Sequence, residues 1–378
     1  MIYFDNAATT QMSQAALEAL INVSKENYGN ASSIYSYGRK SKKILDESRR
    51  IVADCIGAEP EEIYFTSGGT ESDNWAVSQV ISHNIHHIIT SQVEHHAILN
   101  PIRKLEEKGM QVTYLPVNND CVIDIESLRE ELIGNKIFVS LMYQNNETGT
   151  IQKIKQAAQM VHESNPESIF HTDAVQAIGH MKIDVKDLGV DMLSASAHKF
   201  NGPKGIGFLY VRRGLHISSM IEGGGQEFGL RSGTESVASI FSMAKALQDN
   251  IERIDLSIQK QYRMEKRLFT LLSEAGIHYN INGDNNRRAA GIVNISINSI
   301  DAEGLLNALD MHDICVSIGS ACNSKSKISS YVLSAMGINK DRIDSSIRIS
   351  MGRFNLESDV DQLVYRIDKY YKLTAGIS

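Results

Sequence analysis

Lys199 is the residue whose type and setting point most directly to chemistry. It stands in SASAHKFNGPKG (residues 194–205), after an apolar stretch and before Gly202, Pro203 and Gly205. A strand that delivers a lysine into such a loop can hold the amine near apolar groups, where it loses its proton and forms a Schiff base with an aldehyde. Taken alone, the segment is more typical of a lysine on a solvated loop.

A carboxylate and an amide end a second apolar stretch upstream, in FHTDAVQ (residues 170–176). A cofactor with a pyridine ring needs a carboxylate beside the ring nitrogen to keep it protonated, because the cationic ring withdraws electrons from the substrate carbon. Asp173 is suited to that role, with Gln176 close by. The alternative is that Asp173 only caps a helix.

Two further segments supply an anion site and an imidazole. FTSGGTES (residues 65–72) reads as a strand, a Gly-Gly turn and a helix start, where free N–H groups and the Thr70 hydroxyl suit a phosphate. EHHAI (residues 94–98) contains adjacent histidines without the HExxH order, so we expect no metal. His95 could instead stack on a flat cofactor and move protons.

Cys322 lies in SIGSACNSKSKISS (residues 317–330), among small and polar residues that build no core. Cysteine is among the most buried residue types, so a thiol in this setting suggests that its sulfur is needed in the open. Cys55, Cys121 and Cys315 form no CxxC pair, which disfavours a zinc site or a disulfide framework. Cys55 and Cys315 fall on apolar patterns and are expected to pack as small hydrophobes.

The elements that must position these residues follow an α/β pattern. Short apolar runs alternate with helical stretches, such as 96–107 and 151–164, which is typical of a mostly parallel sheet. The strand candidates are EIYFT, HHIITS, QVTYLPV, KIFVSLM, SIFHTDA, DMLSASAH and GIGFLYV. A long helical run over 236–274 is expected to lead into a smaller α+β part. We therefore predict a large α/β domain over residues 16–250 and a small domain made of residues 1–15 and 251–378.

Composition excludes several classes of protein. The chain is 42% apolar and 22% charged with a net charge of −7, which is ordinary for a globular protein and unfavourable for direct nucleic-acid binding. No apolar run is long enough for a membrane helix, and the N-terminus does not resemble a secretory signal. We expect a cytoplasmic protein with no membrane partner.

The combination of motifs resembles a known family. YFDNAATT, TSGGTESDN, EHHAI, NNETG, HTDAVQ, SAHKFNGPKG, GGGQE, RSGT, GSAC and SSIRIS occur in the order and approximate spacing of NifS/IscS-like cysteine desulfurases. These are pyridoxal 5′-phosphate (PLP) enzymes of the class V aminotransferase superfamily. The resemblance spans residue 2 to about residue 355, and SAHK together with RSGT and GSAC is its most specific part.

The resemblance implies a fold and a set of residue roles. It implies a fold-type I homodimer with a mixed, mostly parallel seven-stranded sheet, and L-cysteine as the substrate. Lys199 would form the Schiff base and Cys322 the persulfide, with Asp173 at the ring nitrogen and His95 stacked on the ring. The other cofactor ligands would be Gly69, Thr70, Gln176, Ser196, His198 and, from the other subunit, Thr234. Substrate would meet Asn30, Asn146 and Arg348, the last as a two-pronged carboxylate clamp.

The chain departs from the family pattern at one loop. The common Asn-Pro-Ser-Ser-x-His segment appears as Asn30 to Tyr35 with Ala31 and Tyr35 in place of the proline and the histidine. The sulfur acceptor would be an iron–sulfur scaffold or a tRNA-thiolating enzyme. Because the chain stops soon after its last helical pattern, a single dedicated acceptor is the expectation. The enzyme alternatives are a selenocysteine lyase or another class V aminotransferase, and the non-enzyme alternative is a degenerate partner of a sulfur complex.

Replacing Cys322 by serine separates these alternatives. We expect the Cys322→Ser variant to keep its bound cofactor and to lose sulfur release from L-cysteine, because serine forms no persulfide. The measurement is sulfide and alanine production beside the cofactor absorbance. Full sulfur release by the variant would remove the persulfide mechanism, and a colourless wild-type protein that takes up no PLP would favour the non-enzyme alternative.

Overall fold

The computed structural model describes residues 1–319 and 330–375, and its central element is a seven-stranded sheet in the order β2-β8-β7-β6-β5-β3-β4. The strands are β2 (Ile63–Thr66), β3 (His87–Ser91), β4 (Gln111–Leu115), β5 (Phe138–Ser140), β6 (Ile169–Asp173), β7 (Met192–Ser196) and β8 (Gly207–Val211). β8 pairs antiparallel with β2 and β7, and the other pairs are parallel. The predicted strands and the mixed, mostly parallel sheet are confirmed.

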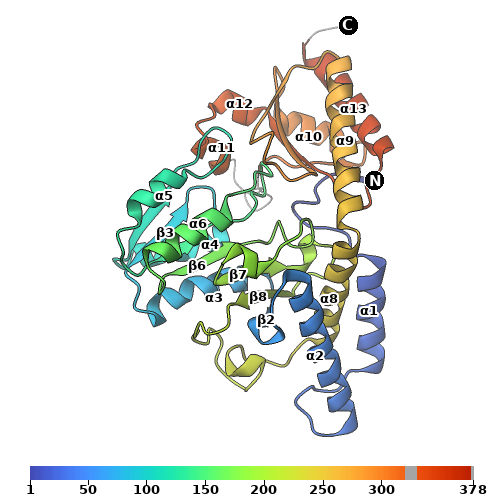
Figure 1. Cartoon of the computed structure of the whole chain (residues 1–378). Coiled ribbons are helices and arrows are strands. Elements are labelled where there is room, and N and C mark those ends of the chain that lie inside the picture. The colour runs from blue at the N-terminus through green and yellow to red at the C-terminus, as the bar shows by residue number, and fades with distance from the viewer. Residues whose placement is uncertain (320–329, 376–378) are drawn as a thin grey trace.

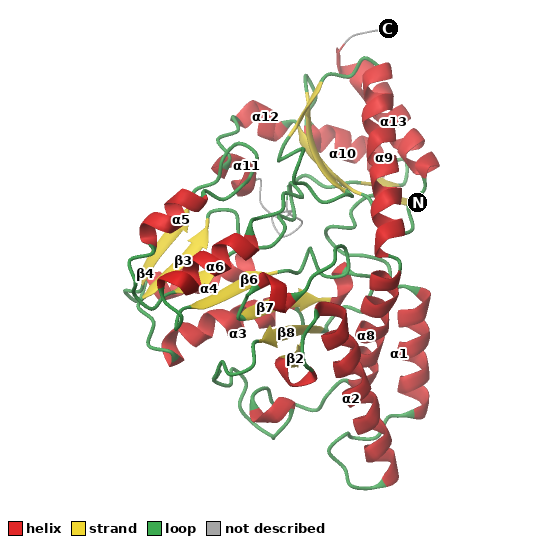
Figure 2. Cartoon of the chain, in the orientation of Figure 1, coloured by secondary structure: helices red, strands yellow, loops and turns green. Residues whose placement is uncertain are grey.

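Helices cover both faces of this sheet (Figure 2). One face packs on α3 (Gly69–Ser82) and α4 (His96–Glu106). The other face packs on α2 (Ser36–Ile56), α5 (Ile125–Glu131), α6 (Ile154–Ser164), α7 (Val185–Leu188) and α8 (Val237–Glu252). Adjacent residues in a strand point to opposite faces, so Phe138 joins the first cluster and Val139 the second. Burial on both faces explains the continuous apolar runs in the sequence.

The C-terminal part forms a separate α+β unit. Its sheet contains β9 (Tyr279–Ile281), β10 (Ile292–Ile297) and β12 (Ser346–Ser350), all antiparallel. The helices are α9 (Ile254–Glu274), α10 (Ala302–Asp310), α11 (Tyr331–Ala335), α12 (Lys340–Asp344) and α13 (Glu357–Ala375). Its apolar core, with α9, α10 and α13, is distinct from the clusters of the large sheet. The domain boundaries stay a prediction, which these separate cores support.

The N-terminal segment passes between the two parts. β1 (Ile2–Tyr3) pairs in parallel with β11 (Ile314–Cys315), and Phe4 is fully buried in the C-terminal core. The chain then crosses to the large sheet, where the N–H of Thr10 donates to the carbonyl of His198 at 2.9 Å. Helix α1 (Gln14–Glu26) packs along α8 (Figure 1). Residues 5–13 therefore lie across the junction.

The helical run predicted over 236–274 is two helices rather than one. α8 ends at Glu252 and α9 begins at Ile254, with Arg253 between them at φ −108° and ψ 6°. The apolar stripe of α8 packs on the core of the large sheet, whereas that of α9 packs on the C-terminal core. Because the two cores lie in different places, the chain changes direction between α8 and α9. The spacing of apolar residues along the sequence does not reveal this change.

Two of the cysteines in the described chain, Cys55 and Cys121, pack in hydrophobic clusters. Cys55 contacts the core of the large sheet, as predicted, and Cys315 lies in β11 half-buried. Cys121 is fully buried at φ 64°, and burial raises the pKa of its thiol to about 12. Within residues 1–319 and 330–375, every helix is too short or too polar to cross a lipid bilayer.

Phe4 tests how strongly the N-terminal segment is anchored. We expect Phe4→Ala to lower the free energy of unfolding by about 3–5 kcal/mol, because it leaves a cavity in the C-terminal core. Phe354→Ala, at a side chain that is 46% exposed, is the matched control and should cost less than about 1 kcal/mol. Denaturant unfolding of both variants measures the difference, and equal losses would mean that Phe4 is not an anchor.

Candidate active site

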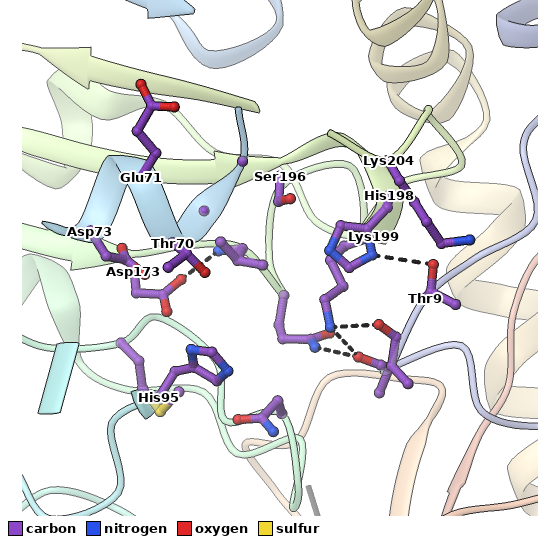
Figure 3. Close-up of a pocket in the computed structure, with 18 of the residues that line it drawn as sticks. Thr9, Thr70, Glu71, Asp73, His95, Asp173, Ser196, His198, Lys199 and Lys204 are labelled. Atoms are coloured by element: carbon purple, nitrogen blue, oxygen red, sulfur yellow. Dashed lines mark hydrogen bonds between the residues drawn. The ribbon is translucent and has the colours of Figure 1, made fainter. Parts of the chain in front are cut away.

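A cavity of about 480 Å³ opens at the carboxyl edge of the large sheet (Figure 3). β2, β3, β5, β6 and β7 all end at this edge, and β12 of the C-terminal part closes the other side with Arg348. Most of the residues predicted from the sequence line this single cavity. They are Gly69, Thr70, His95, Asn146, Asp173, Gln176, Ser196, His198, Lys199 and Arg348.

The turn between β2 and α3 forms one end of the cavity. Gly68 has φ +149°, and α3 begins at Gly69, so the N–H groups of its first turn lack partners within the helix. A Cβ at Gly69 would lie 2.6 Å from Val175, so only glycine allows this close approach. Ser196 faces the same turn. A helix N-terminus with hydroxyl groups nearby is suited to a phosphate.

Lys199 enters the cavity from the short 3-10 turn Ala197–Lys199 that follows β7. Its ammonium donates to the carbonyl of Ala7 and, at 3.0 Å, to that of Ala8 (Figure 3). The turn is held because Gly202 N–H donates to the carbonyl of Ala197, and the His180 ring lies 2.7 Å from the Lys199 carbonyl. The N-terminal segment thus contacts the predicted Schiff-base lysine directly.

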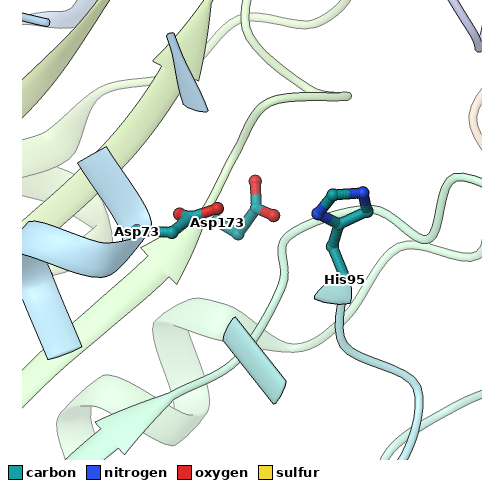
Figure 4. Close-up of side chains that lie close together, drawn as sticks. All are labelled: Asp73, His95 and Asp173. Atoms are coloured by element: carbon teal, nitrogen blue, oxygen red, sulfur yellow. The ribbon is translucent and has the colours of Figure 1, made fainter. Parts of the chain in front are cut away.

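Asp173, Asp73 and His95 converge within 4.8 Å of one another (Figure 4). Burial raises the pKa of both carboxyls. For Asp73 the neighbouring Asp173 raises it further, whereas the positive charge of Lys199 opposes the rise at Asp173. Asp173 is therefore the group that carries the negative charge, and one oxygen of Asp73 has no hydrogen-bond partner. This pair is suited to a cationic group, such as a protonated pyridine nitrogen.

A chain of buried side chains supports the carboxylates from behind. The His171 ring lies between Ser140 and Ser194, with 2.9 Å from ring nitrogen to hydroxyl oxygen on each side. Complete burial lowers the pKa of His171 to about 3, so its ring is neutral. Its Nε2 is also 3.7 Å from Asp73. Because His171 and its two serine partners are neutral, Asp173 carries the negative charge of the site.

His95 caps helix α4, and its Nδ1 accepts a hydrogen bond from the N–H of Ala97 at 3.1 Å. Burial and the charge of Lys199 lower the pKa of His95 to about 4. The ring is therefore neutral at pH 7 and carries its proton on Nε2. This tautomer suits stacking on a flat ring and proton transfer better than it suits metal binding.

Arg348 lines the cavity from β12 of the C-terminal part and is 1% exposed. Its Nη1 donates to the carbonyl of Asn146 at 3.0 Å, and its Nη2 donates to Asp5 at 2.7 Å. Its Nε is buried without a partner, as is the side-chain oxygen of Asn146. An unsatisfied donor on a buried guanidinium is suited to the carboxylate of a bound amino acid.

Two predicted residues within the described chain, Thr234 and Asn30, do not line the cavity of their own chain. Thr234 follows the Gly-rich loop, and Asn30 lies exposed between α1 and α2, where its side chain accepts a hydrogen bond from the N–H of Ser32. Cys322 lies outside the described residues. The roles assigned to these three stay predictions.

The structure adds residues that the sequence did not single out. Asp73 follows one helical turn after Gly69, so the motif TSGGTESDN contains a signal for it. Ala7 and Ala8 lie in YFDNAATT, and no local spacing indicates that their carbonyls reach Lys199.

Comparison with known proteins agrees with this site. The family model for class-V aminotransferases (Aminotransferase class-V) matches residues 2–363. Cysteine desulfurase IscS of Methanosarcina thermophila is 44% identical over 96% of this chain and 90% of its own length. The solved structure of a NifS-like protein is 35% identical and has a TM-score of 0.92, covering 98% of this chain and 99% of its own.

A third relative was solved with an amino acid bound. The structure of SspA in complex with cysteine is 31% identical with a TM-score of 0.83, covering 94% of this chain and all of its own. The fold and site define a protein of the fold-type I class. The chain belongs to the class-V aminotransferase family and, within it, to the cysteine desulfurases, whose members depend on PLP.

Glu94 is an ionisable group buried next to His95. Its Oε1 accepts from the Ser91 hydroxyl at 2.6 Å and from the N–H of Met142 at 2.9 Å, and its Oε2 has no partner. Burial raises the pKa of Glu94 to about 8. Because the folded pKa lies above the ordinary value, this carboxyl stabilises the fold at low pH, and that contribution is lost as pH rises from about 4.5 to about 8.

Glu94→Gln tests this dependence, since glutamine resembles the protonated carboxyl. We expect the stability of the variant relative to wild type to rise with pH between about 4.5 and 8, at up to about 1.4 kcal/mol per pH unit. Denaturant unfolding of the cofactor-free proteins across this range measures it. Glu61→Gln, at an exposed side chain, is the control. A pH-independent difference for Glu94→Gln would contradict a protonated Glu94.

Proposed function

We propose that this protein is a PLP-dependent cysteine desulfurase that converts L-cysteine to L-alanine and leaves the sulfur on Cys322 as a persulfide. The observation that carries the proposal is one cavity lined by Lys199, Asp173, His95, a helix N-terminus and the buried guanidinium of Arg348. Each group suits a different part of a cofactor–amino acid pair. Membership of the cysteine desulfurases supports the same reaction.

The residues of the cavity fit PLP. The first turn of α3, with Thr70, Ser196 and His198, would hold the phosphate, while Asp173 would meet the ring nitrogen. A cationic group at this position would offset the cost of burying the Asp173 carboxylate and would meet the partnerless oxygen of Asp73. Lys199 would hold the cofactor covalently, and Gln176 would lie near its ring hydroxyl. When bound, PLP supplies an electron-withdrawing ring that weakens bonds at the substrate's Cα and Cβ.

The chain's own residues would bind the substrate and move its protons. Arg348 would bind the carboxylate through Nε, and Asn146 would offer its side-chain oxygen beside it. Lys199 would take and return a proton at the substrate's Cα. His95, whose pKa burial lowers to about 4, would transfer protons as a neutral ring. Burial of these groups excludes water and strengthens their interactions.

Sulfur transfer would end the reaction at Cys322. Its thiolate would form an S–S bond with the substrate sulfur as the bond from that sulfur to Cβ breaks, and the electron pair left on Cβ would take up a proton to complete L-alanine. An acceptor protein, an iron–sulfur scaffold or a tRNA-thiolating enzyme, would then receive the sulfur. We also propose a homodimer, in which Thr234 serves the partner's phosphate site. A cytoplasmic location stays a prediction from the sequence.

Lys199→Ala tests the proposal most directly. We expect the wild-type protein to form alanine from L-cysteine and the variant to lose this activity by about a thousandfold or more, because the amine binds the cofactor and moves the proton. Borohydride reduction followed by mass spectrometry should attach PLP to the wild type at Lys199 and leave the variant unlabelled. Lys182→Ala is the control, since Lys182 is exposed and pairs with Asp255. Unchanged alanine formation by Lys199→Ala would refute the assignment.

A further inference from the structure

The guanidinium that would bind the substrate's carboxylate already has a carboxylate partner within the chain. Asp5 accepts from Nη2 of Arg348 at 2.7 Å, and its side chain is 19% exposed while that of Arg348 is 1% exposed. No role in the proposed reaction accounts for Asp5. A buried ion pair beside a binding cavity therefore needs its own explanation.

Both residues of this pair are held firmly by the backbone. Arg348 lies in β12 opposite Asn294 of β10, and its N–H and carbonyl also pair with Ser317. Asp5 follows β1, where the carbonyl of Phe4 accepts from the N–H of Ser350 at 2.7 Å. The side chain of the next residue, Asn6, donates to the carbonyl of Ser350 at 2.8 Å. The two side chains are thus brought together by tertiary contacts.

The guanidinium carries five N–H donors on three nitrogen atoms, and those atoms differ in their partners. Nη1 is used by the carbonyl of Asn146 and Nη2 by Asp5, while Nε is unpartnered. A two-pronged carboxylate complex needs a pair of adjacent N–H donors, such as Nε with Nη2. A bound carboxylate would therefore take Nη2 from Asp5 or share it with Asp5.

The other carboxyl near Arg348 does not supply this negative charge. Glu147 is fully buried, and burial raises the pKa of its carboxyl. It accepts a hydrogen bond from the Ser330 hydroxyl at 2.5 Å. Asp5 is the carboxylate that forms an ion pair with Arg348 within the described residues.

We propose that Asp5 is an internal counter-ion that competes with the substrate's carboxylate for Arg348 and so limits how tightly amino acids bind. Without a ligand, Asp5 prevents the guanidinium from being a buried, uncompensated charge. With a ligand, it offsets part of the attraction for L-cysteine and L-alanine alike, because both carry the same carboxylate. Weaker binding of L-alanine favours its release as product. Tighter binding of the carboxylate would bring no gain in kcat, because it would stabilise the bound substrate and the transition state equally. The inference rests on the proposed role of Arg348.

Asp5→Asn is the test, because asparagine keeps an acceptor for Nη2 and removes the charge. We expect the holoprotein variant to bind L-alanine about tenfold more tightly. This is the change in Kd expected when one competing charge-assisted hydrogen bond to Arg348 is lost. The KM for L-cysteine should fall with it, and kcat should change by less than about twofold. The Kd comes from titrating the cofactor absorbance with L-alanine. Cysteamine and ethylamine, which lack a carboxylate, should bind both proteins equally.

The matched control is Asp249→Asn. Asp249 also pairs with an arginine, Arg353, and its side chain is 15% exposed, but Arg353 does not line the cavity, whereas Arg348 does. We expect Asp249→Asn to lower the thermal stability about as much as Asp5→Asn, and to leave the Kd for L-alanine unchanged. If Asp5→Asn fails to fold, Asp5→Ser removes the same charge with a smaller side chain and carries the same expectation.

The outcomes separate this inference from the proposed function. An unchanged or raised Kd for L-alanine in the Asp5 variant overturns the inference, whether or not the wild type forms alanine from cysteine. A wild type that forms no alanine refutes the proposed function. A tenfold tighter complex of the Asp5 variant with L-alanine would still support competition for Arg348 in that case.

Discussion

Burial of the parallel strands on both faces is the constraint on which the rest of the structure depends. A strand packed between two helical layers can carry almost only apolar side chains, so polar groups collect where the strands end. Five strands of the large sheet reach the same edge, and the residues that follow them line one cavity. Function is concentrated at this edge because polar groups there face the cavity, whereas those inside the sheet, such as His171, Ser140 and Ser194, are hydrogen-bonded to one another.

The same burial controls the charges of the site. Removal from water lowers the pKa of His95 and His171 and raises that of Asp173, Asp73 and Glu94, so most of these groups are neutral. The groups left to carry charge are those with an opposite partner or a ligand to meet. Asp173 has Lys199 nearby, and Arg348 has Asp5. The cavity is thus arranged around a few localised charges.

The N-terminal segment connects the two ends of this arrangement. Asp5 contacts Arg348 of the C-terminal part, and two residues later the carbonyls of Ala7 and Ala8 accept from Lys199 of the large sheet. A short stretch anchored by Phe4 therefore touches both charged groups that would handle the substrate. The positions of Lys199 and Arg348 are therefore linked, because the same N-terminal segment contacts both side chains.

The amino-acid sequence was sufficient to predict the strands, the α/β architecture and ten of the residues that line the cavity. Lys199, Asp173 and the Gly-Gly turn before α3 could be predicted because each follows its own strand, and local spacing is sufficient to place a strand end. Tertiary structure decided the break at Arg253, the pairing of Asp73 with Asp173, and the contacts of Asp5, Ala7 and Ala8. Asp5 and Arg348 lie at opposite ends of the chain, and only the packing of β1 beside β12 and β11 brings them together. Periodicity and spacing describe neighbours along the chain, whereas these contacts arise from how separate cores are packed.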